Sequence, residues 1–270
     1  MTTPDTARLS VPVHYQLSTS EGADYQWLLV HGAMDRATSM GRLTRHLHAT
    51  DVISFDRRGY ATSLEMHPPN SPEEVFAPRH LDDLRTFCDR KPTFIFGHSM
   101  GGTYALLLAA QGHPNLRGVL TYESPLPAEP WWPHWAARPG DLDEPPHDET
   151  LGDRAEAFMV AMVGEERWRR LPEQTRTARR REGFTLIYEM AYLRTSGGRI
   201  DYEKISVPVL AAIGEMAPDR HQRALPFLSE RIPDCRTVAI RKANHGIHLS
   251  QPKTIARLLD EFASSVMRER

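Results

Sequence analysis

The chain has 270 residues, of which 40% are hydrophobic and 25% are charged, and its formal net charge at pH 7 is -2. This length suits one large α/β domain, or one domain that carries an insertion, and the composition is ordinary for a soluble globular protein. Because the charges nearly balance, no global field favours nucleic acid or an anionic membrane, and we expect neither as a partner.

The N-terminal segment and the cysteines predict a cytoplasmic protein. Residues 1–10, MTTPDTARLS, lack the basic start and the apolar stretch of a secretory signal. The longest uninterrupted apolar run, residues 105–110, is far too short to span a bilayer, so we expect no membrane anchor. Cys88 and Cys235 lie far apart and form no metal-binding pattern, so we expect two reduced thiols and no metal.

Short β-prone runs alternate with helix-forming stretches along most of the chain. We expect strands at residues 11–17, 27–31, 52–56, 93–97, 118–123, 207–213 and 237–240. We expect helices at residues 38–48, 78–90, 99–112 and 254–268. This alternation predicts an α/β fold, in which a mostly parallel central sheet has helices on both faces. The nearly continuous apolar strands agree with burial on both faces.

The alternation stops after residue 125, where the Pro- and Trp-rich segment PLPAEPWWPHW leads into several helical patterns with no strand between them. We predict a helical lid at residues 126–200, inserted between a first core segment, 1–125, and a second core segment, 201–270. Apolar stripes on two of its helices, at residues 158–163 and 184–192, are expected to serve packing rather than to form a substrate wall.

Two further features of the predicted lid have two interpretations each. Seven arginines lie between residues 167 and 181, and we expect a solvated helix face rather than a site for an anionic substrate. Trp131, Trp132 and Trp135 either form an aromatic wall at the mouth of a pocket or hold the lid against the core.

The segment GHSMG, residues 97–101, carries the strongest functional signal. It fits the pattern G-x-S-x-G, in which a strained strand-to-helix turn projects a serine hydroxyl above the sheet. A β-prone run precedes it, a helix-forming run follows it, and the glycines would relieve the crowding of so tight a turn. A plain helix N-cap does not require glycine on both sides, so we predict that Ser99 is a nucleophile.

A serine hydroxyl is a weak nucleophile at neutral pH and needs a base within about 3 Å to take its proton, most often a histidine. Of the 13 histidines, His245 stands out because it lies in the loop between the last expected strand and the last expected helix. Loops at the carboxyl ends of parallel strands are where sites form. We predict that His245 is the base and that the nearby His248 is structural.

The oxygen that becomes negative when a carbonyl is attacked needs hydrogen-bond donors, and fixed backbone N–H groups serve best. Met100, directly after the nucleophile, offers an unpaired N–H at the start of a helix. We predict that Ala33, in the loop HGAM at residues 31–34, offers the second N–H. A plain turn is the alternative explanation for Gly32.

These motifs, taken in chain order, resemble the α/β-hydrolase superfamily in its lid-bearing esterase and lactonase-like branch. They are His31-Gly32, then DRRGY at residues 56–60, then GHSMGG at 97–102, then the late His245. The resemblance covers nearly the whole chain and implies a hydrolase that requires no cofactor. It also implies that the turn at Asp56 shapes the pocket floor and has no catalytic task.

The acid that usually completes the family's triad is missing from its usual place. The loop after the strand at 207–213 reads GEMAP rather than G-x-x-D-P, with alanine at the expected aspartate position. Glu123 ends the strand that follows the nucleophile's helix, where certain dehalogenases and lactonases that the chain resembles place their acid. We favour Glu123 to orient the imidazole, with Asp219 as the alternative acid, and Glu215 or no acid also stay open.

We therefore expect a serine hydrolase that cleaves a small-molecule carboxylic ester or lactone through an acyl-enzyme. Dehalogenase and epoxide hydrolase chemistry is disfavoured because it uses a carboxylate nucleophile. Two other functions stay open, namely a C–C bond hydrolase or lyase on the same fold, and a non-catalytic ligand receptor, which the absent loop aspartate would suit. The sequence indicates neither the substrate nor the oligomeric state.

Overall fold

Seven strands form one sheet in the computed structural model, which describes residues 9–133, 139–142 and 148–268. The strands lie in the order β1-β3-β2-β4-β5-β6-β7, and only β1 is antiparallel to its neighbour. Their bounds are β1 Tyr15–Ser18, β2 Gln26–Val30, β3 Asp51–Phe55, β4 Thr93–His98, β5 Leu116–Tyr122, β6 Val209–Gly214 and β7 Cys235–Ile240. The predicted α/β fold with a mostly parallel sheet is confirmed.

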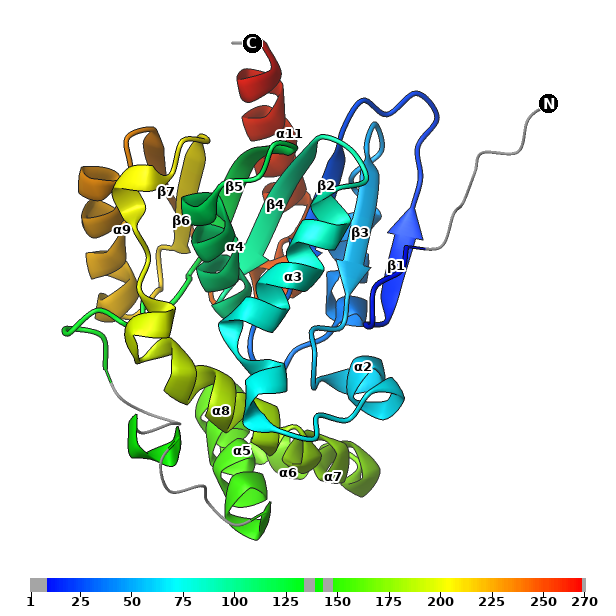
Figure 1. Ribbon diagram of the computed structural model, residues 1–270, viewed down its shortest axis with the longest axis vertical. Coiled ribbons are helices and arrows are strands. Elements are labelled where there is room, and N and C mark those ends of the chain that lie inside the picture. Colours follow the sequence, from blue (N-terminus) through cyan, green and yellow to red (C-terminus); the bar gives the residue numbers. More distant parts are fainter. Residues whose placement is uncertain (1–8, 134–138, 143–147, 269–270) are drawn as a thin grey trace.

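The α-helices cover both faces and one end of this sheet (Figure 1). Their bounds are α1 Gly41–Thr44, α2 Ala61–Met66, α3 Ala77–Cys88, α4 Met100–Gln111, α5 Asp148–Val163, α6 Glu165–Arg169, α7 Glu173–Arg181, α8 Gly183–Leu193, α9 Asp219–Arg231, α10 Ile247–Ser250 and α11 Pro252–Arg268.

Side chains of the central strands alternate between the two faces of the sheet. In β2, Leu28 and Val30 pack in the layer of α3 and α4, whereas Trp27 and Leu29 pack in the layer of α1 and α11. Figure 1 shows α3 and α4 in front of the sheet and α11 behind it. All four side chains are fully buried, which explains why the strands are continuous apolar runs in the sequence.

The helices α5 to α8 lie together beyond the edge at which the parallel strands end, at the bottom of Figure 1. They follow β5 and precede β6, and the described residues between these two strands contain no further strand. Helix α5 packs against α6, α7 and α8, and α8 also contacts α3 of the core. A helical insertion is therefore plausible, and its bounds as a lid at 126–200, between core segments 1–125 and 201–270, stay a prediction.

Three elements differ from the sequence predictions. Strand β1 is shorter than the expected strand at 11–17, because Pro12 has no N–H for the ladder. The expected helix at 38–48 is a 3₁₀ turn, Ala37–Met40, followed by the single turn of α1, and Gly41 at their junction weakens a continuous helix. Helix α9 was not expected, and it carries Pro226 in its interior, where proline usually ends a helix.

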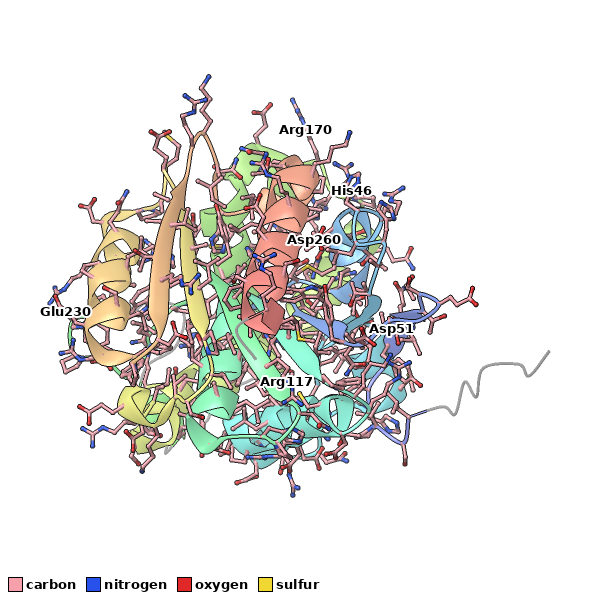
Figure 2. All side chains as sticks on the ribbon, turned by 90° about the horizontal axis from the view of Figure 1, so that it is seen from above. His46, Asp51, Arg117, Arg170, Glu230 and Asp260 are labelled. Carbon is pink, nitrogen blue, oxygen red and sulfur yellow. The ribbon has the colours of Figure 1, made fainter. Side chains whose placement is uncertain are left out.

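Charged side chains of both signs extend from the molecule in Figure 2, including the exposed Arg170 and Glu230. None of the helices in the described ranges combines the length and the apolarity that crossing a membrane requires. Cys88 is buried, Cys235 is partly buried, and the two are not paired with each other.

Candidate active site

Ser99 lies in the turn between β4 and α4, where the backbone is strained. Its φ of 50° and ψ of -125° lie in a region that residues with a side chain rarely occupy. Ser99 is the N-cap residue of α4, yet its side chain makes no capping hydrogen bond. A capping role therefore does not explain the serine, which instead lines a cavity above the sheet.

The glycines beside Ser99 allow this turn to press against its neighbours. A Cβ atom at Gly97 would lie 2.4 Å from the Cα of Gly102, and one at Gly101 would lie 2.1 Å from the carbonyl oxygen of Val30. Real Cβ atoms do not approach backbone so closely. Glycine at 97 and 101 is thus required by the close approach of strand and helix, as the sequence pattern predicts.

His245 is hydrogen-bonded to Glu123. The Nδ1 atom of His245 lies 2.7 Å from Oε2 of Glu123, and the other carboxylate oxygen accepts the N–H of Gly214 at 3.0 Å. Since a carboxylate only accepts, Nδ1 carries the proton and Nε2 keeps a lone pair. Burial alone would raise the pKa of Glu123, but the hydrogen bonds from His245 and Gly214 lower it overall, so the carboxylate stays ionised.

The other two candidate acids lie away from this imidazole. Asp219 is the exposed first residue of α9, and the side chain of Glu215 accepts the backbone N–H of Lys242 at 3.0 Å. Neither makes a hydrogen bond or ion pair with His245 in the described part of the chain. The structure thus brings Glu123, and not Asp219 or Glu215, to His245.

Neighbouring side chains hold the loop that carries His245. Nε2 of His98 donates to the backbone carbonyl oxygen of His245 at 2.7 Å. The hydroxyl of Tyr122 donates to the backbone carbonyl oxygen of Asn244 at 2.8 Å. Burial, together with His248 and His245, keeps the pKa of His98 well below its usual value, so this ring is neutral. His248 is itself buried and lies 3.4 Å from Asp35, in agreement with a structural role.

Ala33 and Met100, the residues predicted to offer the oxyanion donors, line the same cavity. Met100 is the first residue of α4, so its N–H has no acceptor within the helix, and neither it nor the N–H of Ala33 bonds to any described residue. Ala33, Met100 and Ser99 all line the cavity. Gly32 packs directly against the serine, because a Cβ there would lie 2.9 Å from the Cβ of Ser99.

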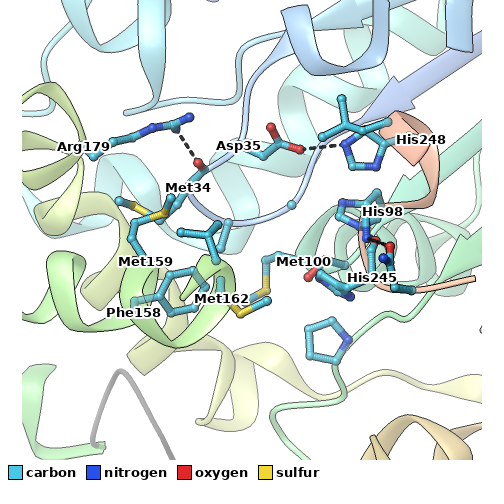
Figure 3. A pocket seen from close by; sticks show the side chains of 18 of the residues that line it. Met34, Asp35, His98, Met100, Phe158, Met159, Met162, Arg179, His245 and His248 are labelled. Atoms are coloured by element: carbon cyan, nitrogen blue, oxygen red, sulfur yellow. Dashed lines mark hydrogen bonds and ion pairs between the residues drawn. The ribbon is translucent and has the colours of Figure 1, made fainter. Parts of the chain in front are cut away.

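Ser99 and His245 line one cavity of about 840 Å³. Within the described residues no hydrogen bond joins the serine hydroxyl to the imidazole. Figure 3 shows His245 and His98 on one side of the cavity and side chains of α5 on the other. The cavity thus lies between the ends of the strands and the inserted helices.

The helical side of the cavity extends one expectation from the sequence. The stripe on α5 packs in the hydrophobic core as expected, and its residues Phe158, Met159, Met162 and Val163 also line the cavity. The second stripe, on α8, packs into the core as expected. Trp132 lines the cavity and packs edge-on against His221 of α9, and Trp131 packs edge-on against Phe227 of the same helix. Trp135 lies outside the described residues.

Arginines are the main charged groups of the lining. Those that line the cavity are Arg42, Arg167, Arg179, Arg194 and Arg220, against the single carboxylate of Asp35. Most of the arginine run is solvated, as expected: Arg169 and Arg170, for example, are exposed and pair with glutamates on their own helix. Arg167, although exposed, and the partly buried Arg179 also line the cavity.

Comparison with known proteins agrees with this geometry. The model of the alpha/beta hydrolase family matches residues 27–258. The chain belongs to the α/β-hydrolase family. A comparison with curated proteins found no match.

Similar solved structures share the fold over almost their whole length. An alpha/beta hydrolase from Sphaerobacter thermophilus DSM 20745 is 25% identical, with a TM-score of 0.70 over 93% of this chain and 95% of that one. The enol-lactonase from Burkholderia xenovorans LB400 is 17% identical, with a TM-score of 0.67 over 93% and 96%. A thermophilic esterase from Thermogutta terrifontis is 19% identical, with a TM-score of 0.65 over 94% and 94%.

Sequence reasoning missed three residues near the site of this α/β hydrolase. His221 of α9 lines the cavity, its ring lies 6.0 Å from that of His245, and burial lowers its pKa to about 3. No local signal marked it, since α9 itself was not expected. Arg57 and Glu189 form a buried ion pair, and only the arginine stands in a motif.

Among the residues that the structure describes, two groups of side chains have the composition of a metal site. They are Asp35 with His98 and His248, and Glu123 with His221 and His245, each with potential ligand atoms within 4.8 Å of one another. The second group contains the histidine and the acid already assigned to proton transfer. That this α/β hydrolase needs no metal or cofactor stays a prediction.

Proposed function

We propose that this α/β hydrolase is a serine hydrolase that cleaves a small-molecule carboxylic ester or lactone through an acyl-enzyme. The observation that carries the proposal is the 2.7 Å contact between His245 and the buried carboxylate of Glu123, beside a cavity that Ser99 also lines. A histidine oriented in this way presents Nε2 as a base for a serine hydroxyl.

In the first half-reaction, Ser99 Oγ bonds to the substrate carbonyl carbon while Nε2 of His245 takes its proton. The electron pair of the C=O bond moves to oxygen, and the N–H groups of Ala33 and Met100 hold the resulting negative charge. Glu123 stabilises the imidazolium. When the tetrahedral intermediate collapses, the C–O bond to the alcohol breaks and the alkoxide takes the proton from His245.

In the second half-reaction, water is the nucleophile in place of the serine hydroxyl. His245 removes a proton from the water as its oxygen attacks the acyl carbon, and the same N–H groups hold the second oxyanion. Collapse returns the proton to Ser99 and releases the carboxylic acid. For a lactone the alcohol stays attached to the acyl group, so one hydroxy acid is the product.

Two observations support an ester or lactone as the substrate. The cavity offers apolar walls from α5 and a volume that suits a small organic molecule. Similar structures include an esterase and an enol-lactonase, although a proline iminopeptidase from Mycobacterium smegmatis is also similar at 18% identity.

Replacement of the nucleophile tests the proposal. Ser99→Ala should lower kcat for the best substrate in a panel of esters, lactones and diketones at least about 10³-fold, with ligand binding retained. A fluorophosphonate should label the unaltered protein stoichiometrically and should not label the variant. Turnover near that of the unaltered protein in Ser99→Ala would refute the serine mechanism, and diketone cleavage alone would favour C–C bond hydrolysis.

A further inference from the structure

A buried ion pair joins the inserted helices to the turn after β3. Arg57 is 1% exposed and Glu189, on α8, is fully buried. The guanidinium binds the carboxylate through both Nη atoms, at 2.6 Å and 3.3 Å. Charges this deep in a protein are kept only when they have several partners, so the remaining contacts of both side chains indicate what the pair is for.

The remaining donors of Arg57 reach the loop that precedes the predicted oxyanion donor. Nε donates to the carbonyl oxygen of His31 at 3.0 Å, and Nη2 donates to that of Gly32 at 3.3 Å. The His31 ring completes the arrangement, because its Nδ1 donates to the oxygen of Gly32 at 2.7 Å and its Nε2 accepts the N–H of Arg57 at 2.9 Å. Two carbonyl groups in succession are thus held on the side of Arg57.

The orientation of these carbonyls determines where the oxyanion donor points. The carbonyl of Gly32 and the N–H of Ala33 belong to the same peptide group, which is planar and trans, so they point in opposite directions. Holding the oxygen of Gly32 against Arg57 therefore aims the N–H of Ala33 away from Arg57. Ala33, Gly32 and Ser99 line the cavity, whereas Arg57 is not among the described residues of its lining, and Gly32 packs against Ser99.

The pair has the partners needed to keep one fixed geometry. The hydroxyl groups of Tyr60 and Tyr104 donate to the two oxygens of Glu189. Burial alone would lower the pKa of Arg57, but Glu189 and these hydroxyls raise it above its usual value. Burial and the nearby Arg57 lower the pKa of His31 to about 4, so at neutral pH its ring both donates and accepts as the contacts require.

A second set of contacts holds the other end of the same loop. Arg179 of α7 donates to the carbonyl oxygen of Met34, and Glu182, between α7 and α8, accepts from Arg36 at 3.3 Å. Glu182, which binds Arg36, and Glu189, which acts through Arg57, both come from the segment that holds α5 to α8. The loop is therefore held by the insertion at both of its ends.

We propose that Arg57 and Glu189 are positioning residues that aim the N–H of Ala33 at the oxyanion, so that helix α8 takes part in building the catalytic centre. The inference rests on the proposed serine hydrolase function. It gives the insertion a task beyond covering the cavity, since displacing α8 would release Arg57 and, with it, the peptide that carries the donor.

The test compares two buried carboxylates that bind neighbouring arginines. Glu189→Gln removes the charge that holds Arg57, whereas Asp83→Asn removes the charge that holds Arg58 at 2.6 Å and 2.8 Å without touching the oxyanion loop. We expect Glu189→Gln to lower kcat for p-nitrophenyl butyrate about 10- to 100-fold, with KM changed less than about threefold. The rate constant for labelling of Ser99 by a fluorophosphonate should fall with kcat, because its phosphoryl oxygen uses the same donors.

The control separates positioning from loss of stability. Asp83→Asn should lower the thermal midpoint comparably but leave kcat within about threefold of the unaltered protein. Wild-type-like kcat in folded Glu189→Gln, or an equal loss of kcat in both variants, would overturn the inference. If Glu189→Gln does not fold, Arg57→Lys serves instead, because an ammonium keeps the charge pair but cannot hold both carbonyls and both carboxylate oxygens.

Failure of this inference is distinguishable from failure of the proposed function. If Ser99→Ala is inactive and Glu189→Gln is fully active, only the positioning role is wrong. If Ser99→Ala keeps its turnover, the serine mechanism is wrong whatever the Glu189 variant does. Rescue of kcat by Glu189→Asp, which keeps the charge with a shorter stem, is the outcome that a purely structural role would not give.

Discussion

Ser99 and Glu123 occupy strained positions just beyond the ends of neighbouring strands. Their φ angles are 50° and 44°, in the left-handed region that favours glycine, at a cost on the order of 1 kcal/mol each. Both backbone N–H groups nevertheless make the next hydrogen bond of the sheet. The N–H of Ser99 donates to the carbonyl of Tyr122 at 2.8 Å, and that of Glu123 donates to the carbonyl of Ala212 at 2.9 Å. The hydrogen bonds of the sheet therefore hold both residues in place although the chain turns there. Because of the turn, their side chains do not follow the alternating directions of side chains within the strands.

The choice of acid is testable at these positions. Glu123→Gln should lower kcat for an ester substrate about 10³- to 10⁴-fold, because the imidazole loses both its orienting acceptor and the charge that stabilises the imidazolium. Asp219→Asn, at an exposed position on α9, should leave kcat within about twofold. Steady-state rates for the two variants at one pH decide between them, and a large loss in Asp219→Asn alone would show that the acid is wrongly assigned.

At the scale of elements, the inserted helices give the cavity its chemical character. Side chains one turn apart share a helix face, which is why Phe158, Met159, Met162 and Val163 of α5 meet the cavity together. The pattern predicted the stripe, but whether a stripe meets a core or a cavity depends on what packs opposite. Helix α6 adds Arg167 at the exposed rim, close in sequence to arginines that only face solvent.

Arginine in the lining predicts a preference for substrates that carry a negative charge. Arg167→Ala should raise KM about three- to tenfold for an ester that bears a carboxylate at low salt, and less at high salt because of screening. Hydrolysis of a neutral ester of the same size should be unaffected. Arg169→Ala, on the same helix but paired with Glu165, is the matched control and should leave both values of KM unchanged.

Several buried histidines make the stability of the fold depend on pH. Burial is the largest cause that lowers the pKa of His31 to about 4 and of His221 to about 3, and it holds the pKa values of His80 and His98 well below the usual range. These rings are neutral in the folded protein at pH values where the unfolded chain would protonate them. Acid therefore favours the unfolded chain.

The sign and the pH window follow from these directions. Above about pH 6.5 the histidines are neutral in both states and contribute no pH dependence. As the pH falls from about 6.5 to about 4, only the unfolded state takes up the protons, so each ring costs on the order of 1 kcal/mol of stability per pH unit. Urea unfolding at pH 8, 6 and 5 should show this decline, and its slope should be smaller in His221→Gln. An unchanged slope in that variant would contradict the assignment for His221.

Local patterns in the sequence predicted the sheet and the strained serine turn well. Strands such as β4 and β6 are short apolar runs bounded by turn residues, and the clash that demands glycine at 97 involves the nearby backbone of Gly102. Gly101, by contrast, is required by the approach of Val30 on β2. Helix α9 was missed because Pro226 argues against a helix, although the packing of Ala224 and Leu228 on the sheet outweighs that cost.

The sequence alone predicted the succession of buried strands along the chain and the strained serine turn. It also limited the possible site to a short set of residues. The sequence favoured Glu123 but left Asp219 and Glu215 open, and the folded chain brings Glu123 to His245, 122 positions away. It also joins Arg57 to Glu189, 132 positions away, which no local pattern indicated. The two kinds of interaction differ in the distance along the chain over which they act. Apolar periodicity and turn sterics act between residues a few positions apart, whereas the partner of a buried charge is set by which strand and helix ends the completed sheet brings together.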